Sequence, residues 1–334
     1  MADTVLKNLL MQYDQKRVKA EHDADNRKQE LYQKFPQLQQ IDDRLTSLAI
    51  STSKAIINSN DKNLLADLNN NIRTLKEEKN NILKSNNVPL NYLEPKYECT
   101  VCMDRGYIIS NNYKTEMCSC LKQKLYDEQY NKANISNLNT QNFEKFSDSF
   151  YSSEINKEKY HSNISPKENI NLIKKICFKF IENFDDPKQK NLLFTGNTGL
   201  GKTFLSSCIA NELIKKGKNV LYQTAPVMLD SIIDYRFGKS GSTNIINSIL
   251  NVDLLIIDDL GTESINNMKF TELFNIINTR LLNQHTITKT IISTNLSLQN
   301  LYANYDERIV SRLVGNYNIC YFFGDDIRFK KRNM

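Results

Sequence analysis

A glycine-rich turn between a short apolar run and a helical stretch has the residue types and spacing that phosphate chemistry requires. Within residues 190–207 (KNLLFTGNTGLGKTFLSS) it matches the pattern G-x-x-x-x-G-K-[ST]. Its glycines let successive backbone N–H groups converge on one anion, and the following helix points its positive end there. The ammonium of Lys202 suits the β- and γ-phosphates of a nucleotide, and the hydroxyl of Thr203 suits Mg²⁺. The predicted binding residues of this turn are Gly196, Asn197, Thr198, Gly199, Leu200, Gly201, Lys202 and Thr203.

A glycine turn that binds nothing is the plain alternative. The apolar run before the turn and the helical stretch after it are both present, and this context favours phosphate binding. The turn by itself does not identify the class of NTPase.

Two adjacent acids follow a second apolar run. Residues 254–257 (LLII) read as a parallel strand buried on both faces, and they lead directly into Asp258 and Asp259. An acid delivered by such a strand downstream of the glycine turn is the Walker B arrangement. We expect Asp258 to hold Mg²⁺, mainly through its waters, and Asp259 to orient or deprotonate the attacking water. A simple turn after a strand is the alternative for this pair.

The next apolar run, TIISTNLS, ends in Thr294 and Asn295. If this strand lies between the strand of the glycine turn and that of the acids, Asn295 would lie beside the γ-phosphate. There it would position the attacking water. The dipeptide alone carries little information.

Three arginines further along are candidates for phosphate contacts. Arg308 and Arg312 are four residues apart, so they share one face of a predicted helix. That face is either solvated or reaches the γ-phosphate of a neighbouring subunit. Arg328 follows the last predicted strand, and it either stabilises phosphate within its own chain or pairs with Asp325 or Asp326.

Four of the seven cysteines form a metal-ligand pattern. Cys99 and Cys102 make a C-x-x-C pair, and Cys118 and Cys120 follow after about fifteen residues, with Gly106 expected in a hairpin between the pairs. This separation predicts a structural, tetrahedral Zn²⁺ site without an open position. The second pair is one residue tighter than usual, so whether zinc uses all four thiolates stays open. A redox pair and scattered thiols are the alternatives.

The other cysteines and the histidines lie elsewhere in the sequence. The cysteines have apolar neighbours and are expected to be core thiols. The histidines are all distant from the four-cysteine pattern, which favours an all-cysteine site. These residues are Cys177, Cys208, Cys320, His22, His161 and His285.

The chain before the cysteines is predicted to be helical. Residues 1–88 are polar, nearly free of glycine, and carry apolar residues at helical spacing. Pro36, the polar stretch 59–62 and Pro89 are expected to delimit a small hairpin or bundle. Such a unit either solubilises the chain or docks a partner protein, and its narrow apolar stripe favours docking. A further helix is predicted over residues 121–131.

From about residue 166 the pattern alternates between strand and helix, which indicates a parallel α/β sheet. Phe143, Phe146, Phe150 and Tyr151, in the preceding polar segment, are expected to pack on this sheet domain or to lie near the adenine, and packing is favoured. The predicted strands are 191–195, 219–223, 253–257, 290–294 and 319–322, and the predicted helices are 168–183, 202–216, 227–237, 268–283 and 307–314.

Size and composition are those of an ordinary globular protein with about two domains. The 334 residues are 40% hydrophobic and 25% charged, and the net charge of +6 permits nucleic-acid contact without requiring it. Apolar runs stay well below 18 residues, and the N-terminus lacks the features of a signal peptide. We therefore expect a cytoplasmic location and no membrane partner.

The motifs together resemble those of AAA+ ATPases of the bacterial replicative helicase-loader type, the DnaC/DnaI family. The resemblance covers nearly the whole chain and is strongest from about residue 95. It rests on the segments GNTGLGKT, LLIIDDLGTE, IISTNLS, ERIVSRLVGNY and FFGDDIR, in this order.

The resemblance implies a fold and a division of labour. The fold is a P-loop AAA+ parallel sheet flanked by helices, preceded by an all-α region and a zinc-binding module. The implied domains are a helicase-docking region over 1–95, a zinc module over 96–130, a linker over 131–165 and an ATPase domain over 166–334. ATP, Mg²⁺ and structural Zn²⁺ are the implied cofactors. The implied partners are the replicative DNA helicase, single-stranded DNA and further copies of the chain that share the ATP site.

The resemblance also implies roles for single residues. Asn295 is implied as sensor 1, Arg312 as the arginine finger and Arg328 as sensor 2. AAA+ proteins more often have Glu where this chain has Asp259, so slow ATP turnover that gates DNA binding and release is expected. Alternatives are a transposition-helper ATPase of the IstB type, a small-molecule kinase, and a nucleotide-gated adaptor with little turnover. A transporter ATPase would need an LSGGQ-like signature, and none is present.

Overall fold

The computed structural model describes residues 2–58, 62–110, 113–129, 141–238, 245–264, 266–283 and 286–332. These form two compact units, one over residues 7–118 and one over residues 1–6 and 119–334. Nothing in the structure tests the predicted domain boundaries, which stay predictions. Within the described part of the chain, no helix is long and apolar enough to cross a membrane.

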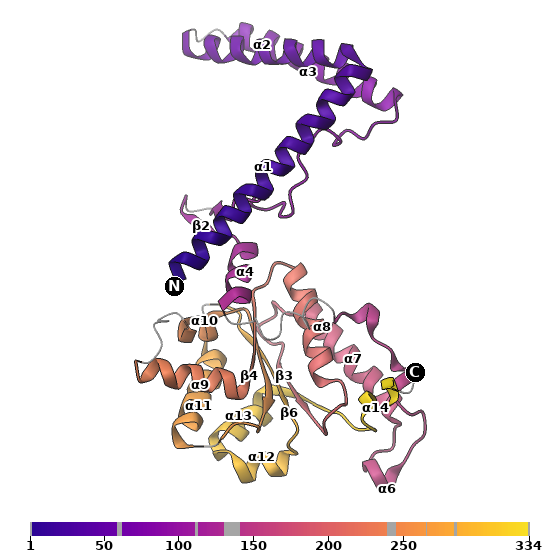
Figure 1. The fold of residues 1–334 in the computed structure, drawn as a ribbon, viewed down its shortest axis with the longest axis vertical. Coiled ribbons are helices and arrows are strands. Elements are labelled where there is room, and N and C mark those ends of the chain that lie inside the picture. Colours follow the sequence, from indigo (N-terminus) through magenta and orange to yellow (C-terminus); the bar gives the residue numbers. More distant parts are fainter. Residues whose placement is uncertain are drawn as a thin grey trace. The chain divides into compact units, whose positions relative to one another are not determined.

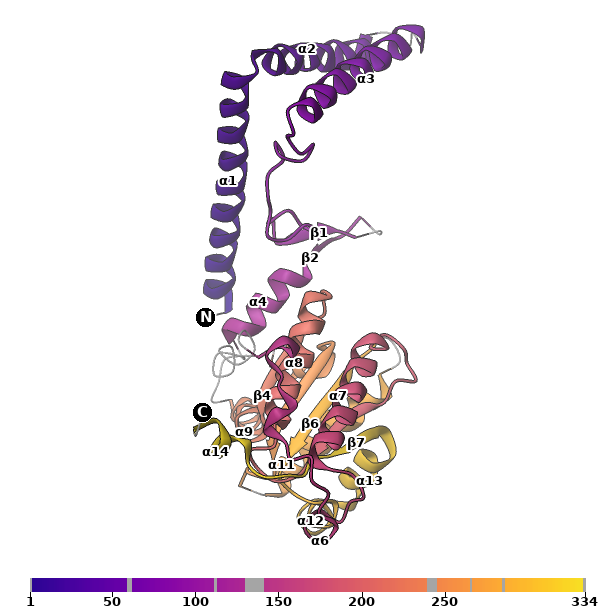
Figure 2. The ribbon, with the colours of Figure 1, turned by 90° about the vertical axis from the view of Figure 1, so that its right-hand side faces the viewer.

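The N-terminal region is helical, as predicted. Its helices are α1 (Ala2–Lys34), α2 (Pro36–Asn58) and α3 (Lys62–Ser85), and α2 and α3 lie side by side (Figure 2). Pro36 begins α2, where a missing N–H costs nothing. An ion pair between Lys79 Nζ and Asp42 Oδ1 (2.6 Å) joins α3 to α2. The predicted break at 59–62 falls mostly outside the described residues.

A two-stranded antiparallel hairpin follows, made of β1 (Tyr107–Ile109) and β2 (Thr115–Met117). The next helix, α4 (Ser119–Gln129), belongs to the unit that contains the large sheet. Its Gln123 exchanges two hydrogen bonds with the backbone of Val220 (Nε2 to O, 3.0 Å; N to Oε1, 2.7 Å). The carboxamide thus acts as a short extra strand on the edge of that sheet. The predicted end of this helix at residue 131 lies outside the described residues.

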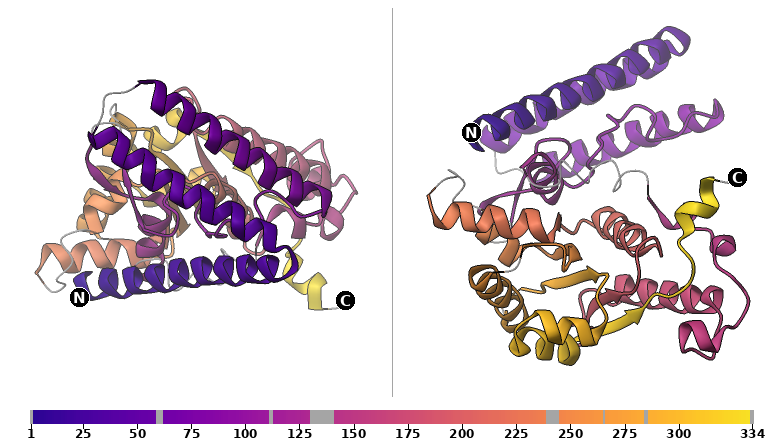
Figure 3. Two further views of the ribbon diagram at one scale, coloured as in Figure 1. Left: turned by 90° about the horizontal axis from the view of Figure 1, so that it is seen from above. Right: turned by 60° about the horizontal axis from the view of Figure 1, so that its bottom comes forward.

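The large sheet has five parallel strands in the order β4-β5-β6-β3-β7. Helices cover both of its faces (Figures 1 and 3). The strands are β3 (Asn191–Thr195), β4 (Val220–Thr224), β5 (Leu254–Leu260), β6 (Lys289–Thr294) and β7 (Tyr317–Tyr321). The helices are α7 (Pro166–Glu182), α8 (Lys202–Lys215), α9 (Ala225–Arg236), α10 (Ile245–Asn251), α11 (Asn267–Leu282), α12 (Leu298–Asn304), α13 (Glu307–Asn316) and α14 (Ile327–Arg332).

The continuous apolar strands are explained by the two cores on either side of the sheet. Leu192 and Phe194 of β3 face the core under α7 and α8, whereas Leu193 between them faces the core under α9, α11 and α13. Since successive side chains of a strand point to opposite faces, a sheet covered twice needs apolar residues at every position.

The five predicted strands and the five predicted helices of this domain are confirmed. The fold adds three short helices that were not predicted, α10, α12 and α14, and β5 runs on to Leu260, so that both acids lie within the strand. The segment before α7 forms short helices, η1 (Phe143–Lys145), η2 (Asp148–Phe150) and α6 (Lys157–Tyr160). Its aromatic residues pack on the core under α7, as expected.

Candidate functional site

The glycine turn is a tight backbone cradle between β3 and α8. Gly196 has φ +138°, and a Cβ there would lie 2.1 Å from the carbonyl oxygen of Phe322. Gly199 has φ +74°, and a Cβ there would lie 1.9 Å from Oδ1 of Asp326. Side chains are therefore excluded by both conformation and space. Gly201 is the N-cap of α8 and has no side chain that could cap the helix. The first backbone N–H groups of α8 are therefore available to an anion.

Lys202 links this cradle to the neighbouring strand β6. Its buried Nζ donates to the carbonyl oxygens of Gly196 (2.6 Å) and Asn197 (2.7 Å) and to Oδ1 of Asn295 (2.8 Å). Burial lowers the pKa of Lys202 to about 8, although the nearby Asp259 and Asp258 act in the opposite direction. The ammonium is thus confined where β3 and β6 end.

The carboxylate of Asp258 accepts hydrogen bonds from hydroxyl groups of three elements. Its Oδ2 accepts from Thr203 Oγ1 of α8 (3.0 Å) and from the Tyr222 hydroxyl of β4 (2.7 Å), and its Oδ1 accepts from the Ser293 hydroxyl of β6. Asp258 as a whole is 3% exposed. A carboxylate and a hydroxyl adjacent to a phosphate cradle are the oxygen ligands that Mg²⁺ prefers, so the donor set fits this ion.

Asp259 has an unusual backbone conformation. Its φ of +55° lies in the left-handed region, and the register between β5 and β6 shifts between Ile257 and Leu260. Thr262 Oγ1 donates to the carbonyl oxygen of Asp259 (2.8 Å). Because of this conformation, the Asp259 side chain does not follow the alternation of side chains between the two faces of the sheet. It points into a cavity instead. Burial, followed by the charge of Asp258, raises the pKa of the Asp259 carboxyl.

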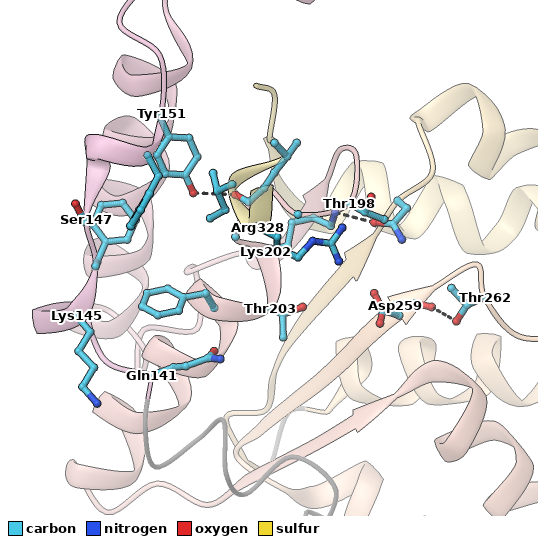
Figure 4. Close-up of a pocket in the computed structure, with 18 residues that line it drawn as sticks. Gln141, Lys145, Ser147, Tyr151, Thr198, Lys202, Thr203, Asp259, Thr262 and Arg328 are labelled. Carbon is cyan, nitrogen blue, oxygen red and sulfur yellow. Dashed lines mark hydrogen bonds between the residues drawn. The ribbon is translucent and has the colours of Figure 1, made fainter. Parts of the chain in front are cut away.

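A cavity of about 450 Å³ opens over these groups (Figure 4). One part is polar, with Lys202, Thr203 and Asp259. Another part lies against the segment around η1 and η2, from which Phe146 and Tyr151 line the cavity. The Tyr151 hydroxyl donates to the carbonyl oxygen of Leu200 (2.9 Å), which fixes this segment to the glycine turn. The shape suits a molecule with a charged end and a flat apolar end.

The arginines divide into two groups. Arg328 lines the cavity, and its guanidinium pairs with Asp326 (2.5 Å). Arg308 and Arg312 do not line it. Arg308 pairs with Asp306 (2.9 Å), Arg312 donates to Asn278 Oδ1 (2.8 Å), and both guanidinium groups lie over the ring of Phe274.

The four cysteines predicted to hold zinc come together. The sulfur atoms of Cys99, Cys102, Cys118 and Cys120 all lie within 4.8 Å of one another. Cys99 and Cys118 are 3.9 Å apart, close to the edge of about 3.8 Å that a tetrahedron of sulfurs about 2.3 Å from Zn²⁺ requires. The donor set and its geometry fit the ion.

Local hydrogen bonds shape the first cysteine pair. Oδ1 of Asp104 accepts from the backbone N–H of Cys99, and the backbone N–H of Gly106 donates to Cys102 Sγ (3.3 Å). Gly106 was expected within the hairpin between the cysteine pairs. It lies at the base of this hairpin, directly before β1, where its carbonyl oxygen accepts from the backbone N–H of Cys118 (2.8 Å) and its φ is +76°.

Comparison with known sequences identifies the family. A family profile described as IstB-like ATP-binding protein matches residues 154–333, more than half of the chain. The chain belongs to this family. The match includes the glycine turn, both acids, Asn295 and all three arginines. The resemblance was expected to cover nearly the whole chain and to be strongest from about residue 95, whereas the profile match begins at residue 154 and leaves out the four cysteines and the segment around η1 and η2.

Individual relatives of this IstB-like protein include helicase loaders and insertion-sequence proteins. The chain is 28% identical over 152 residues to the replicative helicase loader DnaC of Escherichia coli (strain K12). This alignment covers 45% of this chain and 60% of the relative. The chain is 31% identical over 101 residues to an ATP-binding protein of insertion sequence IS1162 from Pseudomonas fluorescens, covering 30% and 43%. A crystal structure of the DnaC helicase loader is 24% identical, with a TM-score of 0.42, and covers 49% of this chain and 94% of that one.

Sequence reasoning missed several groups of the IstB-like site. Tyr222 and Ser293 hold Asp258 from the two strands beside β5, and Gln141 contributes to the cavity wall. Tyr222 and Ser293 were placed in strands, but only the strand order brings them to the acid. For Gln141 the sequence offered no signal.

Proposed function

We propose that this protein is an ATP-dependent loader that binds the replicative DNA helicase and helps place it on single-stranded DNA. ATP binding and hydrolysis would gate DNA binding and release. The observation that carries the ATPase part is the convergence of Lys202, Asn295 and the Asp258 network over one glycine cradle. The relationship to the E. coli loader supports the helicase part.

In the proposed reaction the phosphates of ATP occupy the cradle. Their oxygens replace the carbonyl oxygens of Gly196 and Asn197 as hydrogen-bond partners of the Lys202 ammonium. Thr203 and Asp258 would hold Mg²⁺, which supplies positive charge to the β- and γ-phosphate oxygens. Asp259 orients the attacking water and accepts its proton, and Asn295, directly after the neighbouring strand β6, positions that water. An Asp carboxylate reaches less far than Glu, so we expect slow hydrolysis.

The arginines have different proposed roles. Arg328 leaves Asp326 to contact a phosphate in its own chain, since it already lines the cavity. Arg312 lies outside the ATP cavity of its own chain, so it is free to reach the γ-phosphate of a neighbouring copy. Its half-buried guanidinium rests on the ring of Phe274. Arg308 is the second candidate for the contact with the neighbouring copy. The ATP site would thus be shared between subunits.

The remaining parts of the proposal concern the N-terminal half. The four cysteines would hold a structural Zn²⁺ ion. The ion would stabilise the β1–β2 hairpin, which is too small to have a hydrophobic core of its own. The N-terminal helical region would dock on the helicase.

Two experiments test this proposal with the full-length chain. In Asp259→Asn the amide cannot accept the proton, so ATP hydrolysis should fall by at least tenfold while ATP binding persists. Unchanged hydrolysis would refute the role of Asp259. Copurification with the host's replicative helicase should occur in the presence of ATP, and its absence with ATP, with ADP and without nucleotide would refute the loader function.

A transposition-helper ATPase is the second candidate, since the family profile is that of IstB-like proteins. It predicts ATP-dependent association with a transposase and double-stranded DNA instead of a helicase. A nucleotide-gated adaptor is the third, and it predicts ATP binding with negligible turnover even when helicase and single-stranded DNA are present.

A further inference from the structure

The side chain of Gln141 is placed at the cavity by a fixed backbone. Its carbonyl oxygen accepts a hydrogen bond from Asn211 Nδ2 of α8 (2.7 Å), the helix that begins at the glycine turn. The half-buried carboxamide lines the same cavity as Lys202 and Thr203 (Figure 4). Gln141 is therefore held at a set position relative to the phosphate cradle.

The carboxamide oxygen of Gln141 lacks the hydrogen bond that it needs. Oε1 is enclosed and has no donor among the residues that the structure describes. Buried acceptors are nearly always paired, because an oxygen that loses its hydrogen bonds to water and gains none in return costs free energy. Rotation about the last side-chain bond turns the carboxamide, so a donor that enters the cavity can satisfy it.

Aromatic and aliphatic groups surround this part of the cavity. Phe146, Phe150 and Phe204 line it, and the rings of Phe146 and Phe204 are 6.4 Å apart. Flat apolar walls favour a planar heteroaromatic ring, and one carboxamide at its edge can read that ring by hydrogen bonds.

We infer that Gln141 recognises the adenine base of the nucleotide and selects it against other purines. This inference rests on the proposed ATP site. Oε1 accepts from the exocyclic amino group of adenine, and Nε2 donates to N7 on the same edge of the base, the paired contact for which a carboxamide and adenine are complementary. On this edge a 6-oxo purine presents two acceptors, its 6-oxygen and N7, so one of them faces Oε1 whichever way the carboxamide is turned. The residue lies outside the part of the chain that matches the family profile.

The test measures binding of ATP and inosine triphosphate to the full-length chain with Mg²⁺. The wild type should bind ATP about ten- to a hundredfold more tightly than inosine triphosphate. In Gln141→Ala the affinity for ATP should fall to near that for inosine triphosphate, which itself should hardly change and so reports an intact fold. Gln299→Ala, an exposed glutamine of α12 away from the cavity, is the matched control and should keep the wild-type ratio.

Other outcomes separate the two proposals. Equal losses for both nucleotides in Gln141→Ala would overturn the inference and indicate a structural role. Unchanged selectivity in that variant would also overturn it, while leaving the ATP site in place. If the wild type binds neither nucleotide, the proposed ATP site itself fails, and the inference fails with it.

Discussion

The affinity of this protein for ATP should depend on pH through Lys202. In the free protein, burial lowers the pKa of this side chain to about 8. The phosphates of ATP would surround the ammonium with negative charge and raise its pKa again, toward or above the ordinary lysine value. Binding therefore favours the protonated form, and ATP affinity is lost as the pH rises through the free-state pKa.

The magnitude follows from this pKa. Below pH 8 the lysine is already charged in the free protein, and the affinity should be constant. Above pH 8 binding must first take up a proton, so the dissociation constant should rise up to about tenfold per pH unit, about 1.4 kcal/mol. The second ionisation of a phosphate monoester has a pKa near 6 and is essentially complete by pH 8, so the ligand contributes no change above pH 8.

Titrations of ATP binding between pH 7 and 9.5 at constant ionic strength measure this effect. Lys202→Arg is the matched control, since a guanidinium remains charged throughout. Its affinity can be weaker, but it should stay flat where that of the wild type falls. Equal slopes in the two proteins, or a flat wild-type profile, would refute the reasoning.

Three further predictions concern residues around this site and the cysteines. Arg312→Ala should leave ATP affinity within about twofold of the wild type and lower hydrolysis by at least tenfold; lost affinity would indicate a role in its own chain's site. Cys102→Ser should reduce bound zinc, measured by metal analysis of the purified protein, and lower the melting temperature; unchanged zinc would exclude this ligand. Tyr305→Phe should cost about 1–3 kcal/mol in denaturant unfolding, because the buried Glu263 carboxylate loses its hydroxyl donor; Tyr302→Phe, at an exposed position of α12, the helix that ends just before Tyr305, should cost nothing.

The parts of the fold that depend on local sequence could be predicted closely. The strand before the glycine turn has the predicted bounds, Asn191–Thr195, because its apolar run and the turn after it are both local signals. Helix α7 begins earlier than predicted, at Pro166, where Ser165 and Glu168 form a capping box that the apolar periodicity does not register. The helices α10 and α12 are seven residues long, too short for that periodicity to appear.

The contacts around the acids depend on which strands are neighbours, and a single sequence does not contain this information. Placing β6 between β3 and β5 was a conditional expectation, and it brings Asn295 to Lys202. The same order brings Tyr222 and Ser293 to Asp258 from opposite sides, yet Tyr222 belongs to no motif and Ser293 had no predicted role within IISTNLS. For Arg328, two partners were left open, and the fold selects Asp326, two residues away, because Asp325 pairs with Lys159.

The loop after Asp259 contacts the segment just before α13, the helix that carries Arg308 and Arg312. Glu263 accepts from the backbone N–H of Gly261 (2.9 Å) and from the hydroxyl of Tyr305, which precedes α13. The ring of Tyr305 in turn packs against Phe270 of α11, the helix that also supplies the partner of Arg312. A left-handed residue such as Asp259 keeps its conformation only when its surroundings enforce it. The water-activating carboxylate that we propose is therefore held by the same packed elements that support Arg312. We therefore expect a change in the packing of α13 to alter the geometry of Asp259 as well, which would couple the two halves of the proposed shared site within each chain.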